Sequence, residues 1–171
     1  MWCLHQKNDD LSKEDGPVYG EFIRTFTFDS VSLPIVQPGG FVVFPDPTVR
    51  PSGVEQVSSS IDGKEFEGLS VPGGVYRIRW ALNPSEGAEV TLQVNGKTPT
   101  SKDKFPYGKQ IKDSKEPIGA DYLVLAPKKE GNLISIINSG STLFTLSELP
   151  YTRIGNRYIL TQIQVKRISP L

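Results

Sequence analysis

The stretch GGVYRIRWALNPSEGAEVTLQVNG, residues 73–96, decides the fold class. In both of its halves, large apolar residues alternate with polar or smaller ones, which is the period of a β-strand with one buried face. The apolar faces are made by Tyr76, Ile78, Trp80 and Leu82 in the first half and by Val90, Leu92 and Val94 in the second. The stretch therefore predicts two amphipathic strands separated by a short turn.

Length and composition indicate one ordinary globular domain. The 171 residues are enough to bury a core without disulfides or metal ions. The 16 glycines and 14 prolines follow no three-residue period, which excludes a collagen-like repeat. A formal charge of zero gives no reason to expect nucleic acid or an anionic membrane as partner. No apolar run approaches the roughly 18 residues of a membrane-spanning helix.

The remaining sequence also predicts short strands separated by glycine and proline turns. Asp62-Gly63 and Asn95-Gly96 are two-residue hairpin signals, and no segment shows a helical period. Eight to ten strands at regular spacing favour an all-β sandwich or barrel. The further strands are expected within residues 22–28, 41–44, 58–66, 120–126, 132–138, 141–146 and 156–168, the last with Ile159, Thr161, Ile163 and Val165 on one face.

Two segments lack a strand pattern. Residues 1–18 are polar and are broken by Gly16 and Pro17, so we expect an N-terminal arm followed by a single domain over residues 19–171. Residues 97–118 hold six lysines and three prolines and are expected to form a long loop. A loop of this length in a compact β domain is either functional or simply solvated.

Residue types that carry catalysis are scarce. The single histidine, His5, and the single cysteine, Cys3, both lie in the arm, where no surrounding structure would hold a catalytic pair in place. Two such residues are also too few for a structural zinc site within one chain. Several carboxylates are expected in or beside loops, where calcium binding stays open although no EF-hand loop is present: Asp46, Asp62, Asp103, Asp113 and Asp121. The sequence predicts no enzyme, no cofactor and no defined metal site.

Taken together, four segments resemble the C1q/TNF-like jelly-roll superfamily, particularly its bacterial, spore-surface members. They are GGVYRIRWAL, AEVTLQVNG, NLISIINSGSTLFTL and the closing RYILTQIQVKRI, and the resemblance covers about residues 22–169. The chain departs from the family pattern at Gly131-Asn132, where Gly-Asp is frequent, and in its long loop and missing collagen stalk. The resemblance implies two packed antiparallel sheets of about ten strands, assembled as a homotrimer.

The aromatic residues are more numerous than one small core needs, so some are expected between subunits, where aromatic side chains are enriched. The alternative is that all of them pack inside the monomer. Arg77 and Arg79 are expected to face outward as rim contacts. The trimer-interface candidates are Tyr76, Trp80, Tyr122, Tyr158, Phe22 and Phe26.

Two functions are compatible with these observations. The first is a structural block of a bacterial spore coat or exosporium, made in the mother cell without a signal peptide, since MWCLHQKNDD has no apolar signal core. Cys3 could then form an intermolecular disulfide, and the arm could contact other surface-layer proteins; outside a spore the expected location is cytoplasmic. The second is a recognition module, TNF/C1q-like or a phage-type head, that binds a receptor or ligand through Lys102, Lys104, Phe105, Tyr107 and Lys109.

Overall fold

The structure is a computed structural model that describes residues 16–27, 32–61, 63–98, 100, 102, 108–150 and 153–171. Every regular element in these ranges is a β-strand, and ten of them are longer than two residues. The strands are β1 (Tyr19–Thr27), β2 (Ile35–Val36), β3 (Asp46–Pro47), β4 (Glu55–Ile61), β5 (Lys64–Val71), β6 (Gly74–Pro84), β7 (Glu89–Val94), β8 (Lys109–Ile111), β9 (Ile118–Ala126), β10 (Asn132–Asn138), β11 (Phe144–Ser147), β12 (Arg153–Ile154) and β13 (Arg157–Ser169).

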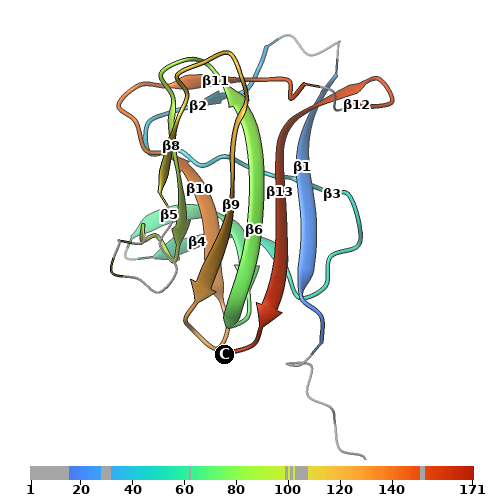
Figure 1. The fold of residues 1–171 in the computed structure, drawn as a ribbon, viewed down its shortest axis with the longest axis vertical. Coiled ribbons are helices and arrows are strands. Elements are labelled where there is room, and N and C mark those ends of the chain that lie inside the picture. Colours follow the sequence, from blue (N-terminus) through green and yellow to red (C-terminus); the bar gives the residue numbers. More distant parts are fainter. Residues whose placement is uncertain are drawn as a thin grey trace, which may run out of the picture.

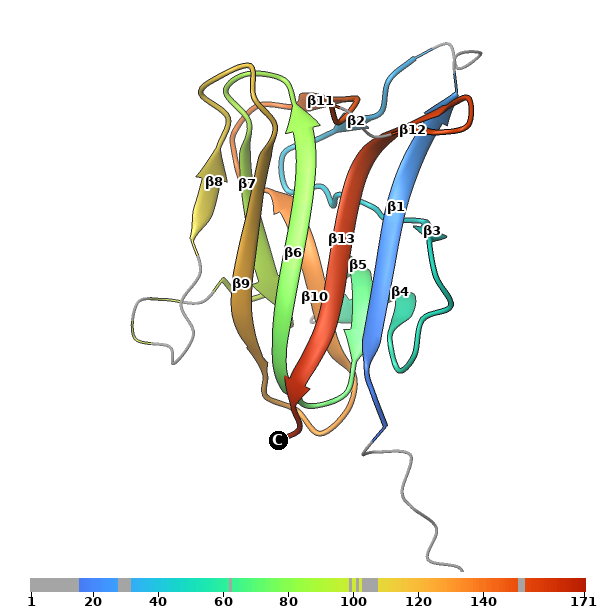
Figure 2. The ribbon, with the colours of Figure 1, turned by 45° about the vertical axis from the view of Figure 1, so that its right-hand side comes forward.

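The strands form two sheets that face each other (Figure 1). The front sheet has the long strands in the order β9-β6-β13-β1, with the short β2, β3, β11 and β12 at its margins. The back sheet has the order β4-β5-β10-β7-β8. All pairings between the strands are antiparallel, and Figure 2 shows the back sheet behind the long strands of the front sheet.

The strand order is that of a jelly roll. The chain crosses from the back sheet to the front between β5 and β6, returns between β6 and β7, and crosses again between β8 and β9 and between β9 and β10. The first and last long strands, β1 and β13, are neighbours. Repeated crossing of this kind makes the two Greek keys of a jelly-roll sandwich. The all-β, two-sheet jelly roll predicted from the sequence is therefore confirmed.

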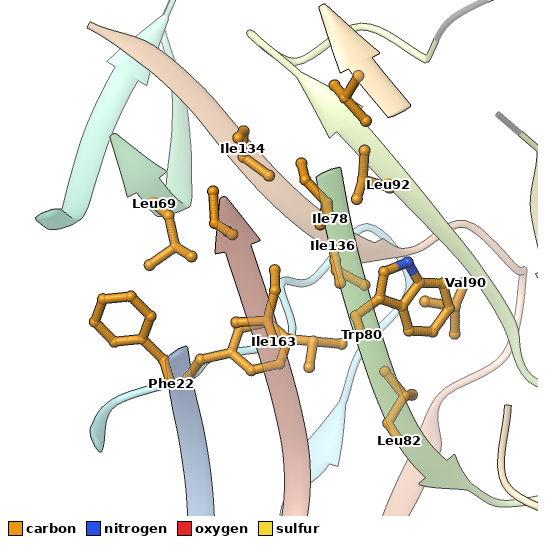
Figure 3. Close-up of a cluster of buried hydrophobic side chains, with 14 of the residues drawn as sticks. Phe22, Leu69, Ile78, Trp80, Leu82, Val90, Leu92, Ile134, Ile136 and Ile163 are labelled. Atoms are coloured by element: carbon orange, nitrogen blue, oxygen red, sulfur yellow. The ribbon is translucent and has the colours of Figure 1, made fainter. Parts of the chain in front are cut away.

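The core lies between the sheets, where the inward faces of the strands meet (Figure 3). The front sheet contributes Phe22, Ile78, Trp80, Leu82 and Ile163, and the back sheet contributes Leu69, Val90, Leu92, Ile134 and Ile136. β6 alternates strictly between buried and more exposed positions over Gly74–Leu82, as the opening pattern predicted. Of the face predicted for residues 156–168, Thr161, Ile163 and Val165 are buried on the inner side, whereas Ile159 lies beyond a register shift and packs with Ile23 and Leu149 on the outer side instead.

One edge of β10 is divided between two partners. β5 pairs with the first part of β10, over Asn132–Ile134, and then continues with β4 alone. Residues 39–42 take over the same edge farther along, where Val42 N donates to Ile136 O at 2.8 Å and Asn138 N donates to Gly40 O at 2.9 Å. The chain then crosses to the front sheet, so residues 42–45 form a strap between the layers before β3 pairs with β1.

Several boundaries differ from those predicted. Residues 41–44 form one isolated bridge, from Phe41 to Ile137, and then the strap, because the chain has to cross between sheets there. Residues 97–118 are not strand-free, since β8 and the start of β9 lie in this range. Val18, which was assigned to the arm, is buried in the core. Both hairpin signals are confirmed by the pairing of Ile61 with Lys64 and the bridge from Val94 to Lys97.

Candidate functional site: the outer face of the front sheet

The outer face of the front sheet carries cross-strand rows of charged, amide and apolar side chains. The antiparallel register places Leu123, Arg77, Lys166 and Tyr19 in one row across β9, β6, β13 and β1. The next row is Asp121, Arg79, Gln164 and Glu21. These side chains alternate along their strands with the inward residues of the core, so the core pattern also fixes which residues reach this face.

Asp121 joins two arginines of the neighbouring strand. Its carboxylate accepts hydrogen bonds from Arg77 Nε at 2.9 Å, from Arg77 Nη2 at 2.7 Å and from Arg79 Nε at 2.8 Å. These charge-assisted bonds hold the pKa of Asp121 well below its usual range. All three side chains are about half exposed, so the network orders the face but contributes little to the stability of one chain.

Glu21 on β1 makes a second polar group with two glutamines of β13. Its Oε2 accepts from Gln164 Nε2 at 2.6 Å, and its Oε1 accepts from Gln162 Nε2 at 3.4 Å. The acid and its partners face outward between the apolar residues Tyr19 and Ile23. Because bonded neighbours fix their positions, the polar side chains of this face are held in place before any partner binds.

Part of the face is covered by the chain itself, and part is open. Near one end of the sheet, Leu149 packs with Ile23 and Ile159, and Leu149 N donates to Ile159 O at 2.7 Å. The rows described above lie beyond this cover. In them Leu123 and Tyr19 are 46% and 42% exposed. This part of the face therefore places an ordered arginine pair beside exposed apolar side chains.

Three of the predicted interface residues are not on any surface. Phe22, Tyr76 and Trp80 are at most 3% exposed and pack between the two sheets of one chain. Their assignment to a subunit interface is wrong, because these side chains lie on the inward faces of their strands and fill the core of the single chain. The hydroxyl of Tyr76 donates to Pro72 O at 2.8 Å, and burial raises its pKa to about 12.

The other three rings are partly buried. Tyr122 packs against the core edge, and its hydroxyl accepts from Gln110 Nε2 at 2.7 Å, which joins β9 to β8 of the opposite sheet. Phe26 and Tyr158 are register partners on β1 and β13. Their role at an interface stays a prediction. The outward orientation predicted for Arg77 and Arg79 is confirmed.

The loop and arm candidates lie largely outside the described residues. This holds for Lys104, Phe105, Tyr107 and Cys3. Lys102 is exposed, and Lys109 forms an ion pair with Glu89 at 3.0 Å. Lys102 and Lys109 are therefore the two of the five loop candidates whose positions are known, and a contact role for the loop stays a prediction.

Asp121 was expected in or beside a loop but lies within β9. Its partners could not be found from the sequence, because they depend on the pairing of β9 with β6. Within the described ranges, no three His, Cys, Asp or Glu side chains form a group that could hold a metal ion. In the same ranges no helix has the length and apolar character needed to cross a bilayer.

The chain matches no family model and no curated protein sequence. Among solved structures it is similar to the globular domain of zebrafish complement 1qA protein, with a TM-score of 0.46 and 13% sequence identity. The similarity covers 91% of this chain and all of the zebrafish domain. The assignment of this chain to the jelly-roll fold rests on its own strand order.

Proposed function

We propose that the protein is a non-enzymatic assembly module that forms a homotrimer through the outer face of the front sheet. The observation that carries the proposal is the open part of this face, where the joined Arg77, Asp121 and Arg79 lie beside the exposed Leu123 and Tyr19. Exposed apolar side chains beside ordered arginines are stabilised when a partner removes them from water.

A closed ring of three requires this face to contact a different patch of the neighbouring copy. A face that contacts a different patch of the next copy generates a ring when the rotation closes. Three copies are the number that the C1q/TNF resemblance implies. The setting that we propose, a surface layer such as a bacterial spore coat or exosporium, rests on the same resemblance.

The test is the mass of the purified protein by light scattering coupled to size-exclusion chromatography. We expect a mass near three times the 18.9 kDa of one chain at micromolar concentration. Leu123→Glu should reduce it to that of one chain, because a carboxylate would be buried in the interface. Leu143→Glu is the matched control, since Leu143 is an equally exposed leucine, 50% accessible, outside the cross-strand rows. A wild-type monomer would overturn the proposal.

A further inference from the structure

The turn that follows β7 contains the only Asn-Gly pair of the sequence, Asn95-Gly96. Both residues have left-handed backbone conformations, with φ angles of 54° and 72°. The flanking residues Val94 and Lys97 exchange two backbone hydrogen bonds, each of 3.0 Å. Positive φ at both central residues is the mark of a type I′ turn, for which Asn-Gly is a preferred pair.

The same pair of residues is chemically labile, because asparagine can lose its side-chain amide without an enzyme. In this reaction the backbone nitrogen of the following residue attacks Cγ of asparagine, ammonia leaves, and a cyclic succinimide forms. Water then opens the ring at either carbonyl, which gives aspartate or isoaspartate. Glycine as the following residue favours the attack, because it has no Cβ to shield its nitrogen and leaves the backbone free to rotate.

In the folded chain the side chain of Asn95 is bound to β10. Its Oδ1 accepts a hydrogen bond from Leu133 N at 2.9 Å, and its Nδ2 donates to Asn132 Oδ1 at 3.2 Å. Asn95 N also donates to Leu133 O at 2.8 Å. Asn95 therefore continues the pairing of β7 with β10 past its last rung, between Val94 and Ile134, and uses its side-chain oxygen in place of a main-chain carbonyl.

The group that holds the Asn95 amide is itself firmly held. Asn132 is fully buried, and its amide exchanges hydrogen bonds of 2.7 and 2.9 Å with the backbone of Lys128. For Gly96 N to reach Cγ of Asn95, the Asn95 amide has to rotate away from both Leu133 N and Asn132 Oδ1. The attack therefore requires the turn to open first, which breaks both hydrogen bonds of this side chain.

We propose that Asn95 is a latent site of spontaneous succinimide formation, which the folded state blocks and unfolding exposes. Both products damage the contact with β10. Aspartate replaces the Nδ2 donor with an oxygen that faces the acceptor Asn132 Oδ1, and isoaspartate adds a methylene group to the main chain inside a tight turn. A chain that remains unfolded therefore loses, with time, its ability to regain the native fold.

The test compares the folded chain with the chain in guanidinium chloride at the same mildly alkaline pH, by mass spectrometry of tryptic peptides. Residues 80–97 form one such peptide, and its other asparagine, Asn83, cannot react because Pro84 has no N–H. The mass gained when an amide becomes an acid therefore reports Asn95 alone. We expect the folded chain to convert more slowly by roughly a hundredfold, because only opened molecules react. Equal rates in the two states would overturn the proposal.

A pair of variants tests the consequence for refolding, measured by circular dichroism after increasing times in denaturant. Asn95→Gly tolerates the positive φ but has no amide to lose, so its refolded yield should stay at its own initial value. The wild type should lose yield as Asn95 converts. Asn156→Gly is the matched control, since Asn156 is an exposed asparagine in the turn between β12 and β13, and this variant should lose yield as the wild type does. A wild-type yield that stays constant after Asn95 has converted would also overturn the proposal. Neither readout depends on the mass of the assembly, so each can fail or succeed apart from the proposed trimer.

Discussion

Asn132 and Asn138, the first and last residues of β10, have fully buried amides that hold the loops at the two ends of this strand. Asn132 Nδ2 donates to Lys128 O at 2.7 Å, and its Oδ1 accepts from Lys128 N at 2.9 Å. Asn138 Nδ2 donates to Thr142 O at 2.9 Å and to Val36 O at 3.1 Å. Both loops are therefore fixed to the central strand of the back sheet by side chains that have no exposure to water.

Replacing Asn138 with Ala should destabilise the fold by roughly 2 to 4 kcal/mol, because the carbonyl groups of Val36 and Thr142 lose the donor that a buried side chain provides. Urea unfolding at neutral pH measures the change. Ser135→Ala is the control in the same strand, since Ser135 Oγ is buried and the described part of the chain offers it no hydrogen-bond partner. That variant should be neutral or slightly more stable, and equal losses for the two would contradict the role assigned to Asn138.

Trp80 provides a second pair of variants with opposite expectations. Its Nε1 is buried, and no partner for it is found in the described ranges, so the N–H makes no hydrogen bond that would offset the cost of its burial. Trp80→Phe should cost little beyond the lost ring volume, whereas Trp80→Ala should cost about 3 to 5 kcal/mol from the cavity left in the core. Thermal unfolding followed by circular dichroism distinguishes the two. A large loss in Trp80→Phe would show that the indole N–H has a partner.

The pH dependence of Asp121 has a defined sign. Because its pKa is lowered in the folded state, its contribution to stability is present at neutral pH and is lost only on acidification below the unfolded value of about 4. The difference in urea midpoint between the wild type and Asp121→Asn should therefore be constant from about pH 8 to 5 and shrink only below about pH 4. A difference that changes near neutral pH would point to another titrating group.

Lys112 gives a pH dependence of the same sign at the alkaline end of the range. Its ammonium is buried and donates to Asn83 Oδ1 at 2.9 Å and to the carbonyl oxygen of Glu116. Desolvation lowers the pKa of Lys112, so the folded state binds its proton less well than the unfolded chain. Stability should therefore rise with pH, relative to Lys112→Met, as the pH approaches the unfolded value of about 10.4. Parallel urea titrations of the two proteins give the difference, and a falling difference would contradict the burial of the ammonium.

The strands were predictable because alternation depends on neighbours in sequence. Residues 132–138 were expected as a strand and form β10 with the same bounds. The same alternation does not predict which of the two sheets each strand joins. The opening stretch provides two strands in sequence, but β6 lies in the front sheet and β7 in the back sheet.

The side-chain network on the open part of the outer face could not be predicted from the sequence. Asp121 meets Arg77 and Arg79 only because β9 pairs with β6 in one register, and a shift by one residue would turn Asp121 inward. Aromatic rings such as Trp80 were assigned to an interface although they lie in the core. The sequence does not distinguish the two environments, because both favour large apolar side chains.

The divided edge of β10 also bears on how this protein can change over evolutionary time. The half of the β4–β5 hairpin beyond Leu69 has no pairing with the rest of the back sheet, so residues can be inserted or deleted near Gly63 without shifting the register of β10. Loop tips of this kind tolerate changes in length. Related chains should therefore differ most in the length of this hairpin, while their cores stay alike.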